Sequence, residues 1–304
     1  MVVVFGSINL DFVTRVPRFA APGETLAGEA FATHPGGKGA NQAFAAARAG
    51  ARTSLIGAVG ADTFGDAALA LVRAAGVDTT RIRTLDTATG IASIAVNAAG
   101  ENSIVVVAGA NARVDPGDVP DDWLTPSAVL VLQNEVPGDA NKAVAVRAAR
   151  RHARTIYNAA PGRTVDAAFL GSITALVVNE TEMGEIARAH GLAPLPEAFV
   201  IDYARCFRAI AIVTLGAAGV VAADTQRGYR VPAPSVSVVD TTGAGDAFVG
   251  ALAAALDRGD GLREALPFAV AAGSIACTGE GAQTALPGAE AIKSLAASVE
   301  AQIT

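Results

Sequence analysis

The sequence predicts an α/β fold: a mostly parallel central sheet flanked by helices on both faces, with a small additional β-sheet. Short β-branched runs alternate with alanine-rich segments of helical length along most of the 304 residues. Two stretches, at about 11–35 and 90–107, instead show short alternating segments without a helix-length pattern. Because no repeat or low-complexity linker divides the chain, we expect a single domain over residues 1–304.

The main sheet and its helices follow from this alternation. Buried β-branched or apolar runs predict strands at 2–5, 54–59, 128–132, 155–158, 175–178, 210–215, 220–223 and 236–239. Alanine-rich segments predict helices at 39–49, 64–75, 139–152 and 180 to about 190, and three more fill most of the chain after residue 244. Gly50 and Gly76 stand where a left-handed residue ends a helix.

The two irregular stretches predict a small antiparallel sheet made by two insertions. Its strands are expected at 12–16, 26–33, 91–97 and 103–107, with Gly100 in a hairpin between the last two. We expect this sheet to project from the main one as a discontinuous lid. Exposed strand edges invite pairing, so a homodimer through the lid is a hypothesis.

Charge and composition exclude several classes of partner. The net charge is −6 and no basic tract suggests nucleic acid or an anionic membrane surface. The longest nearly apolar run, 209–223, is shorter than the roughly 20 residues of a membrane span. Cys206 and Cys277 are far apart without a CxxC motif, which excludes a disulfide framework and a zinc cluster. The first residues lack the basic region of a signal peptide, and a cytoplasmic setting is expected.

The glycine-rich loops match neither common nucleotide-binding fingerprint. Gly36–Gly39 lacks the spacing of a P-loop, and the first strand is not followed by GxGxxG. Gly243-Ala-Gly245 comes nearest to the dinucleotide motif, but Phe248 stands where the third glycine belongs. A dinucleotide-dependent dehydrogenase is therefore disfavoured.

The segment Asp240–Gly250 carries the most specific chemical signal. Its glycines open a predicted helix, and backbone N–H groups at a helix N-terminus form an anion site without a basic side chain. Asp246 lies in the first helical turn, where it could accept a proton from an attacking hydroxyl. It could equally complement the helix dipole.

Polar residues at two other strand ends are candidates for binding a ligand. In Gly36–Gln42, the glycine pair permits close approach of a ligand, and Lys38 and Asn41 offer donors to sugar hydroxyls. A flexible turn with a solvated lysine is the alternative. Asn9 and Asp11 follow the first strand at alternate positions, either facing a ligand together or forming an Asx turn.

Asn179 and Glu182 also follow a predicted buried strand. Their spacing is that of a capping box at a helix N-terminus. The same pair could reach a magnesium–nucleotide phosphate through water, because Mg²⁺ often keeps several of its waters. The two roles are compatible.

As an ordered set, these motifs closely resemble the ribokinase (PfkB) family of carbohydrate kinases from about Val4 to Pro287. The matching elements are Asn9 and Asp11, GGKGAN at 36–41, GAN at 109–111, Glu135, NETE at 179–182, VTLGAAG at 213–219, DTTGAGD at 240–246 and GAQ at 281–283. The resemblance implies a ribokinase-like fold and an ATP-dependent kinase of a sugar's primary hydroxyl, converting D-ribose to ribose 5-phosphate.

The resemblance also implies roles for individual positions. Asp246 would be the general base, with Gly243, Ala244 and Gly245 as the anion hole. Sugar hydroxyls would be held by Asn9, Asp11, Gly37, Lys38, Asn41, Glu135 and Asp246. Asn179 and Glu182 would order Mg²⁺–ATP, and Thr214, Leu215, Gly216, Ala217, Gly219 and Gly245 would line the nucleotide site. A K⁺ ion would be held, mostly by backbone carbonyls, at Asp240, Thr242, Ala276, Gly279 and Gly281.

Other acceptors and one different class of function stay open at this point. A sibling kinase could act on adenosine, pseudouridine, fructose or 2-keto-3-deoxygluconate. Phe12, directly after Asp11, could stack on a nucleobase or pack beneath the lid. A catalytically silent sugar or nucleotide sensor is the non-enzymatic alternative, and the intact GAGD motif with Asp246 argues against it.

Overall fold

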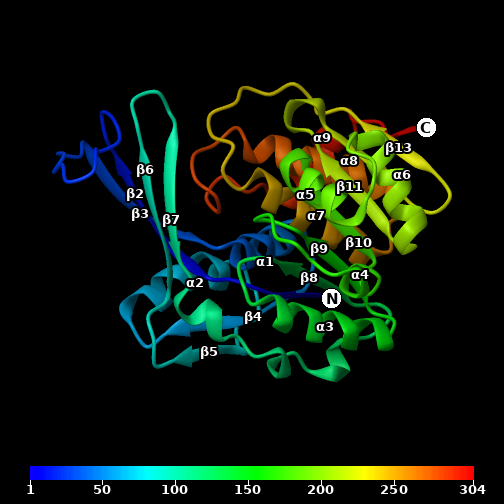
Figure 1. Ribbon diagram of the computed structural model, residues 1–304, viewed down its shortest axis with the longest axis horizontal. Coiled ribbons are helices and arrows are strands. Elements are labelled where there is room, and N and C mark those ends of the chain that lie inside the picture. The colour runs from blue at the N-terminus through cyan, green and yellow to red at the C-terminus, as the bar shows by residue number, and fades with distance from the viewer.

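The computed structural model describes residues 1–304 and has the predicted α/β sandwich with a smaller sheet beside it (Figure 1). The main sheet has ten strands in the order β14-β13-β12-β11-β10-β9-β8-β1-β4-β5. Its seven parallel strands are β1 (Val2–Phe5), β4 (Thr53–Gly60), β5 (Ile82–Leu85), β8 (Val129–Gln133), β9 (Arg154–Asn158), β10 (Ala175–Asn179) and β11 (Ile210–Thr214). An antiparallel edge follows, with β12 (Val220–Ala223), β13 (Gly228–Val231) and β14 (Gln302–Ile303).

Helices cover both faces of this sheet because side chains along each strand alternate between two apolar cores. In β1, Val2 and Val4 enter one core of 46 buried residues, while Val3 and Phe5 enter another of 36. The first core is covered by α1 (Lys38–Arg48), α2 (Thr63–Ala74), α7 (Ala244–Arg258), α8 (Leu262–Ala276) and α9 (Ala289–Ala296). The second is covered by α3 (Gly138–Arg150), α4 (Ala167–Leu170), α5 (Glu180–His190) and α6 (Pro196–Phe207). None of the helices combines the length and hydropathy that a membrane span requires.

One predicted strand is wrong. Residues 236–239 form no strand, and Val238 and Val239 are more than half exposed. The backbone N–H groups of Val239 and Asp240 donate to the carbonyl of Cys277, at the end of α8, instead of to a neighbouring strand. A short β-branched run predicts an extended backbone, but it does not specify whether that backbone has a strand to pair with.

The smaller sheet contains β2 (Asn9–Arg15), β3 (Ala30–Gly36), β6 (Gly90–Val96) and β7 (Asn102–Val107), in the order β3-β2-β6-β7. Each hairpin is antiparallel, as predicted, but β2 and β6 pair in parallel, which corrects the expectation of an all-antiparallel sheet. The first strand of each hairpin follows a parallel strand of the main sheet, β1 or β5, so both enter in the same direction. The second strand also begins later than expected, at Ala30 and not at residue 26.

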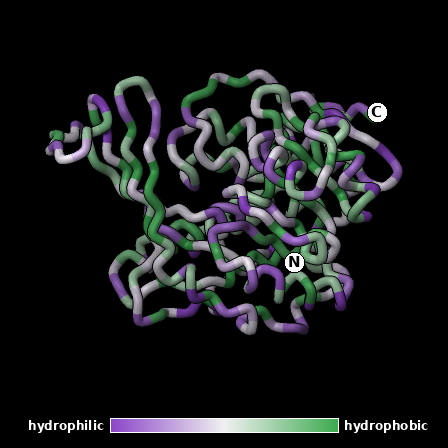
Figure 2. Tube along the Cα trace, viewed as in Figure 1, coloured by the Kyte–Doolittle hydropathy of each residue, from purple (hydrophilic) through white to green (hydrophobic).

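The outer strand of the smaller sheet is largely uncovered. All six residues of β7 are exposed, and Ile104 to Val107 are each at least half exposed. Figure 2 shows this part of β7 as a hydrophobic segment on the sheet that stands apart from the main body. A free apolar edge of this kind is unusual in a monomeric protein.

Helices α1 and α7 pack unusually closely because Gly250 lies between them. A Cβ atom on Gly250 would be 2.4 Å from Cβ of Ala45 and 2.7 Å from the carbonyl oxygen of Gln42. Gly250 lies one turn after Asp246 in α7. The missing side chain therefore brings the first turns of the two helices together.

We predict that Gly250→Ala destabilises the protein, although alanine is the better helix former. The added methyl group must push α1 and α7 apart, at a cost of about 1–3 kcal/mol, which should lower the melting temperature by several degrees. Gly184→Ala in α5 is the matched control, because nothing lies within 4 Å of its new Cβ. That variant should gain up to about 1 kcal/mol from helix propensity. Thermal unfolding followed by circular dichroism compares the two, and equal melting temperatures would contradict the packing argument.

Candidate active site

Polar residues gather where the carboxyl ends of the parallel strands meet the N-termini of α1 and α7. Asp246 lies in the first turn of α7 and is 6% exposed. Its Oδ2 accepts a hydrogen bond from Nδ2 of Asn41, and its Oδ1 accepts one from Nε2 of Gln42, each 2.9 Å long. Both oxygens of the predicted base are thus held by amide groups from α1.

The N-terminus of α7 presents backbone donors that have no partner. Gly243 has φ of 79° and begins the helix without a side-chain cap. The N–H of Ala244 donates to the carbonyl of Thr241 at 3.2 Å, whereas those of Gly243, Gly245 and Asp246 make no hydrogen bond. A Cβ on Gly243 would lie 3.0 Å from Cα of Ala282, so only glycine fits this left-handed position. The loop is therefore built to bind an anion, mainly through these three N–H groups.

The N-terminus of α1 serves the opposite purpose, because an acidic residue of the chain occupies it. Oε2 of Glu135 accepts from the N–H of Lys38 (2.9 Å) and from the hydroxyl of Ser7 (2.6 Å). The N–H groups of Gly39 and Ala40 donate to Oγ and the carbonyl of Ser7. Glu135 thus caps a helix that has no side-chain cap at Gly37, and its second oxygen remains for a ligand.

Asn9 and Asp11 lie in β2 and form no Asx turn. Oδ1 of Asn9 accepts from Nδ2 of Asn111 at 2.7 Å, and Asn111 also bonds the N–H and the carbonyl of Ile8. The carboxylate of Asp11 lies against Gly36, whose Cβ would be 2.2 Å from it, and Oδ1 of Asp11 is buried without a partner. The sequence did not indicate roles for Ser7 and Asn111, which lie more than 100 residues from the partners they hold.

Four carboxylates and one ammonium group share this region. Burial, then Glu135 and Asp246, raise the pKa of Asp11 to about 7. The pKa of Lys38 is raised by Asp246 and, more weakly, by Glu135 and Glu182, against the effect of burial. Burial raises the pKa of Glu182 despite the nearby charge of Lys38. Lys38 therefore stays protonated, because the carboxylates of Asp246, Glu135 and Glu182 all favour its charged form.

Asn179 and Glu182 form the predicted capping box of α5. Oδ1 of Asn179 accepts from the N–H of Glu182 at 2.9 Å, and Oε2 of Glu182 accepts from the N–H of Asn179 at 3.0 Å. The capping interpretation is confirmed. Because Glu182 also interacts electrostatically with Lys38 and Asp246, the same pair faces the polar site.

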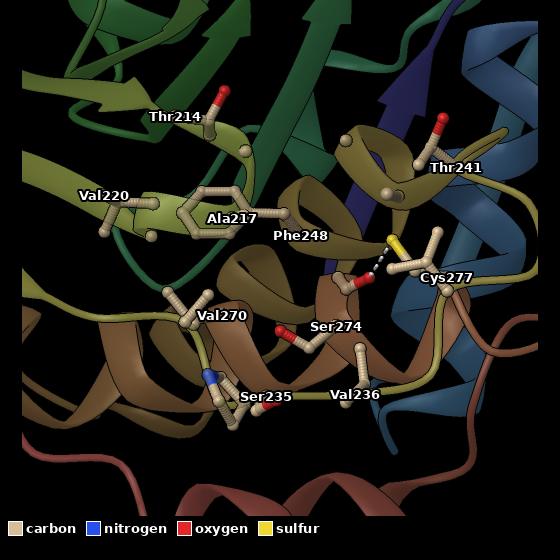
Figure 3. A pocket seen from close by; sticks show the side chains of 18 residues that line it. Thr214, Ala217, Val220, Ser235, Val236, Thr241, Phe248, Val270, Ser274 and Cys277 are labelled. Atoms are coloured by element: carbon tan, nitrogen blue, oxygen red, sulfur yellow. Dashed lines mark hydrogen bonds between the residues drawn. The ribbon is translucent and has the colours of Figure 1, made fainter.

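A mostly apolar cavity of about 510 Å³ adjoins the α7 N-terminus (Figure 3). The predicted nucleotide residues Thr214, Gly216, Ala217, Gly219 and Gly245 line it, while Leu215 packs against the second core and Asn179 and Glu182 lie outside. In Figure 3 the ring of Phe248 lies beside Val220 and Ala217, with Val270 and Ser274 across the cavity. Lining residues that the sequence did not indicate are Val220, 233–236, Val238, Thr241, Phe248, Val270, Gly273, Ser274 and Cys277. Among these residues the sequence offered a signal only for Phe248, which follows Ala244 by four positions and so lies on the same face of α7.

The predicted cation residues are only partly brought together. Oδ1 of Asp240 accepts from the N–H and hydroxyl of Thr242, and its Oδ2 accepts from the N–H of Gly281 at 3.0 Å. Burial raises the pKa of Asp240, but these hydrogen bonds outweigh it and hold the pKa below its ordinary value. Ala276 ends α8 and Gly279 lies in the turn that follows. The atoms of these residues that could ligate a metal ion are all oxygens, which suits a hard cation.

We predict that Asp11 makes stability depend on pH. Between about pH 4 and pH 7 the folded protein keeps a proton on Asp11 that the unfolded chain has lost, so this residue lowers stability as pH rises through that range. Asp11→Asn removes the buried charge and should raise the melting temperature by about 2–4 °C at pH 8, with little change at pH 5.

Thermal melts of both proteins at pH 5 and pH 8 test this, with exposed Asp86→Asn as the control. A gain for Asp11→Asn that is equal at both pH values would contradict it.

Known proteins are similar to this chain in sequence and fold along nearly its whole length. The pfkB family carbohydrate kinase pattern matches residues 1–289. A ribokinase of Lactococcus lactis is 37% identical over 278 residues, which covers 90% of each chain. Solved structures of a Thermotoga maritima ribokinase and of Arabidopsis thaliana ribokinase complexed with ribose and ATP each have a TM-score of 0.88 and 31% identity, covering 97% of this chain and 98% of theirs. The chain belongs to the pfkB family of carbohydrate kinases and is a phosphotransferase with an alcohol group as acceptor.

Proposed function

We propose that this protein is an ATP-dependent ribokinase, which transfers the γ-phosphoryl group of ATP to the primary hydroxyl of D-ribose. One observation carries the proposal: a single helix end joins two sites. Gly245 lines the apolar cavity, and the next residue, Asp246, belongs to the polar cluster with Asp11, Glu135 and Lys38. A base, a set of free N–H donors and two adjoining binding sites are what phosphoryl transfer needs. The names of the relatives supply the choice of ribose.

The sugar would lie in the polar cluster. Ribose is rich in hydroxyl groups, and each hydroxyl needs hydrogen-bond partners when it leaves water. Asp11 and Glu135 each have an oxygen without a hydrogen-bond partner, and Lys38 supplies donors. Gly37 would admit the sugar close to the backbone. Asn41 has little left to offer, because Asp246 and Gln283 already engage its amide at both ends.

Transfer would proceed in line between the two sites. Asp246 accepts the proton of the primary hydroxyl as the hydroxyl oxygen attacks the γ-phosphorus, and the bond from that phosphorus to the bridging oxygen breaks to release ADP. The N–H groups of Gly243 and Gly245, with that of Asp246 itself, donate to the oxygens of the moving phosphoryl group. They need no rearrangement, because they are already free and fixed at the helix end.

The adenine and ribose of ATP would occupy the apolar cavity, with the phosphates directed to the α7 N-terminus. Glu182 and Asn179 fit a magnesium ion bound to those phosphates, reached through its water shell, because they offer a buried carboxylate and an amide oxygen. Bound Mg²⁺ would neutralise phosphate charge. Lys38, whose pKa is raised, adds a positive charge near both substrates.

A potassium ion is part of the proposal on the same basis. Asp240 and Thr242 join the turn at Gly281, and the backbone carbonyls of Ala276, Gly279 and Gly281 would complete an oxygen-only site. That site would lie directly before the anion-binding loop. Its charge would favour the negative charge that develops at the loop.

The nucleoside-kinase alternative gains no support from Phe12. Phe12 alternates with Asp11 along β2, so it faces the other side of the smaller sheet. Its ring lies 5.2 Å from that of Phe64 and 6.1 Å from that of Phe31, centroid to centroid. It therefore packs beneath the sheet against α2 and is not placed to stack on a base.

We also propose that the smaller sheet acts as a lid and that two copies pair through it. The exposed apolar edge of β7 supports pairing with a second copy. A cytoplasmic setting fits two free cysteines and a reaction that consumes ATP.

Replacing an apolar β7 residue by a charge should separate the two copies. Val105→Lys places an ammonium group on the most exposed apolar position of the strand, which would be buried unpaired in a dimer. Light scattering at micromolar concentration should give twice 30.4 kDa for the wild type and 30.4 kDa for the variant. A monomeric wild-type protein would rule out this pairing.

ADP release over a panel of acceptors tests the function itself. With ATP, Mg²⁺ and K⁺, ribose should give the highest kcat/KM among ribose, fructose, adenosine, pseudouridine and 2-keto-3-deoxygluconate, and omitting K⁺ should lower it. Asp246→Asn should reduce kcat by about 10²–10⁴-fold, because it removes the base, while ADP binding is kept. Preferred turnover of a nucleoside would replace the proposed acceptor, and near-normal turnover of the variant would remove the base assignment.

A further inference from the structure

The two hydrogen bonds that Asp246 accepts from side-chain amides belong to a longer chain of buried, hydrogen-bonded side chains. Gln283 donates to Oδ1 of Asn41 at 3.0 Å, and Asn41 donates to Oδ2 of Asp246. From the other side, Gln42 donates to Oδ1 of Asp246 and, at 3.1 Å, to Oδ1 of Asn158. All five side chains are at most 8% exposed. They come from α1, α7, β9 and the loop after α8.

The direction of every hydrogen bond in this chain is fixed by two groups that can only accept: the carboxylate of Asp246, in the middle of the chain, and the carbonyl of Val177, at one end. The carboxylate of Asp246 accepts from both sides, so Gln42 and Asn41 must each turn an NH₂ group toward it. The second N–H of Gln42 meets Asn158, whose own NH₂ donates to the carbonyl of Val177 at 3.2 Å. The amide of Gln42 is therefore locked in one orientation by two acceptors, although its Oε1 has no partner.

We infer that Gln42 is a positioning residue for phosphoryl transfer: its amide fixes the rotation of the Asp246 carboxylate, so that the carboxylate meets the attacking hydroxyl already aligned. The inference rests on the proposed role of Asp246 as base. A carboxylate held on one oxygen only, by Asn41, can still rotate about its Cβ–Cγ bond. With Gln42 on the second oxygen that rotation is blocked, and the free lone pairs keep one direction.

Gln42 is also placed to do this by packing. It lies in the α1 turn that contacts Gly250, and its carbonyl oxygen and the nitrogen of Ala46 are the two backbone atoms that a Cβ on Gly250 would approach to 2.7 Å. The close approach of the two helices therefore sets the distance over which its side chain reaches α7.

Gln42→Met keeps the size of the side chain and removes both donors. Because chemistry and not binding should suffer, kcat is expected to fall about 10- to 100-fold, while KM for the sugar and for ATP changes less than about twofold. Gln133→Met is the matched control, since Gln133 is an equally buried amide on β8 that makes no side-chain hydrogen bond. Its kcat should equal that of the wild type. Gln42→Asn, whose shorter amide cannot span the same distance, serves if the methionine variant does not fold.

A double-mutant cycle separates positioning from packing. In the Asp246→Asn background, Gln42→Met should lower the residual kcat by less than about twofold, because no charged base remains to be aligned. Equal losses in both backgrounds, an unchanged kcat in Gln42→Met, or a loss shared by Gln133→Met would each overturn the inference. The base assignment fails separately, if Asp246→Asn alone retains turnover, and the choice of ribose fails separately, if the wild type does not phosphorylate it.

Discussion

The site depends on the contact between the first turns of α1 and α7. Asp246 comes from α7, and both groups that hold its carboxylate come from α1, more than 200 residues earlier in the chain. The contact is possible because Gly250, one turn further on, has no side chain to keep the helices apart. Side-chain hydrogen bonds near 2.9 Å tolerate little displacement, so the packing of two helices sets the geometry of the chemistry. Gly250, which has no side chain, thus controls the position of the Asp246 carboxylate, the proposed base.

The N-termini of α1 and α7 differ in what their backbone N–H groups bind. The N–H groups of α1 bond to Glu135 and Ser7 inside the protein, which fixes Glu135 at the proposed sugar site. Those of α7 are left free at Gly243, Gly245 and Asp246. A chain with a net charge of −6 can bind a polyanion in this way, because its phosphate site uses backbone dipoles and needs few basic side chains. A cluster of acids surrounds a single lysine, and burial, with smaller contributions from Glu135 and Asp246, raises the pKa of Asp11.

The sequence predicted the fold class, most elements of the main sheet and the residues with free functional groups, because periodicity and glycine-rich motifs are local. It did not predict what holds those residues. Ser7 meets Glu135, and Gln42 meets Asp246, across 128 and 204 positions, and no local pattern records such a contact. The strand expected at 236–239 failed for a related reason. Val236 and Val238 line the cavity, and the N–H of Val239 bonds to the end of α8 instead of to a neighbouring strand.

The carboxylates of the site differ in how many hydrogen bonds their oxygens accept, and this difference indicates how substrates would be ordered in the site. Asp246 has both oxygens bonded, and Glu135 has one, whereas Oδ1 of Asp11 is buried with none. A buried carboxylate that accepts no hydrogen bond costs folding free energy, and a sugar hydroxyl can donate such a bond. The sugar therefore gains most at Asp11, on the smaller sheet, and gains least at Asp246, which is already held. Binding energy would thus be directed to the smaller sheet, which is the proposed lid, and the proposed base would keep the position that the two helices give it.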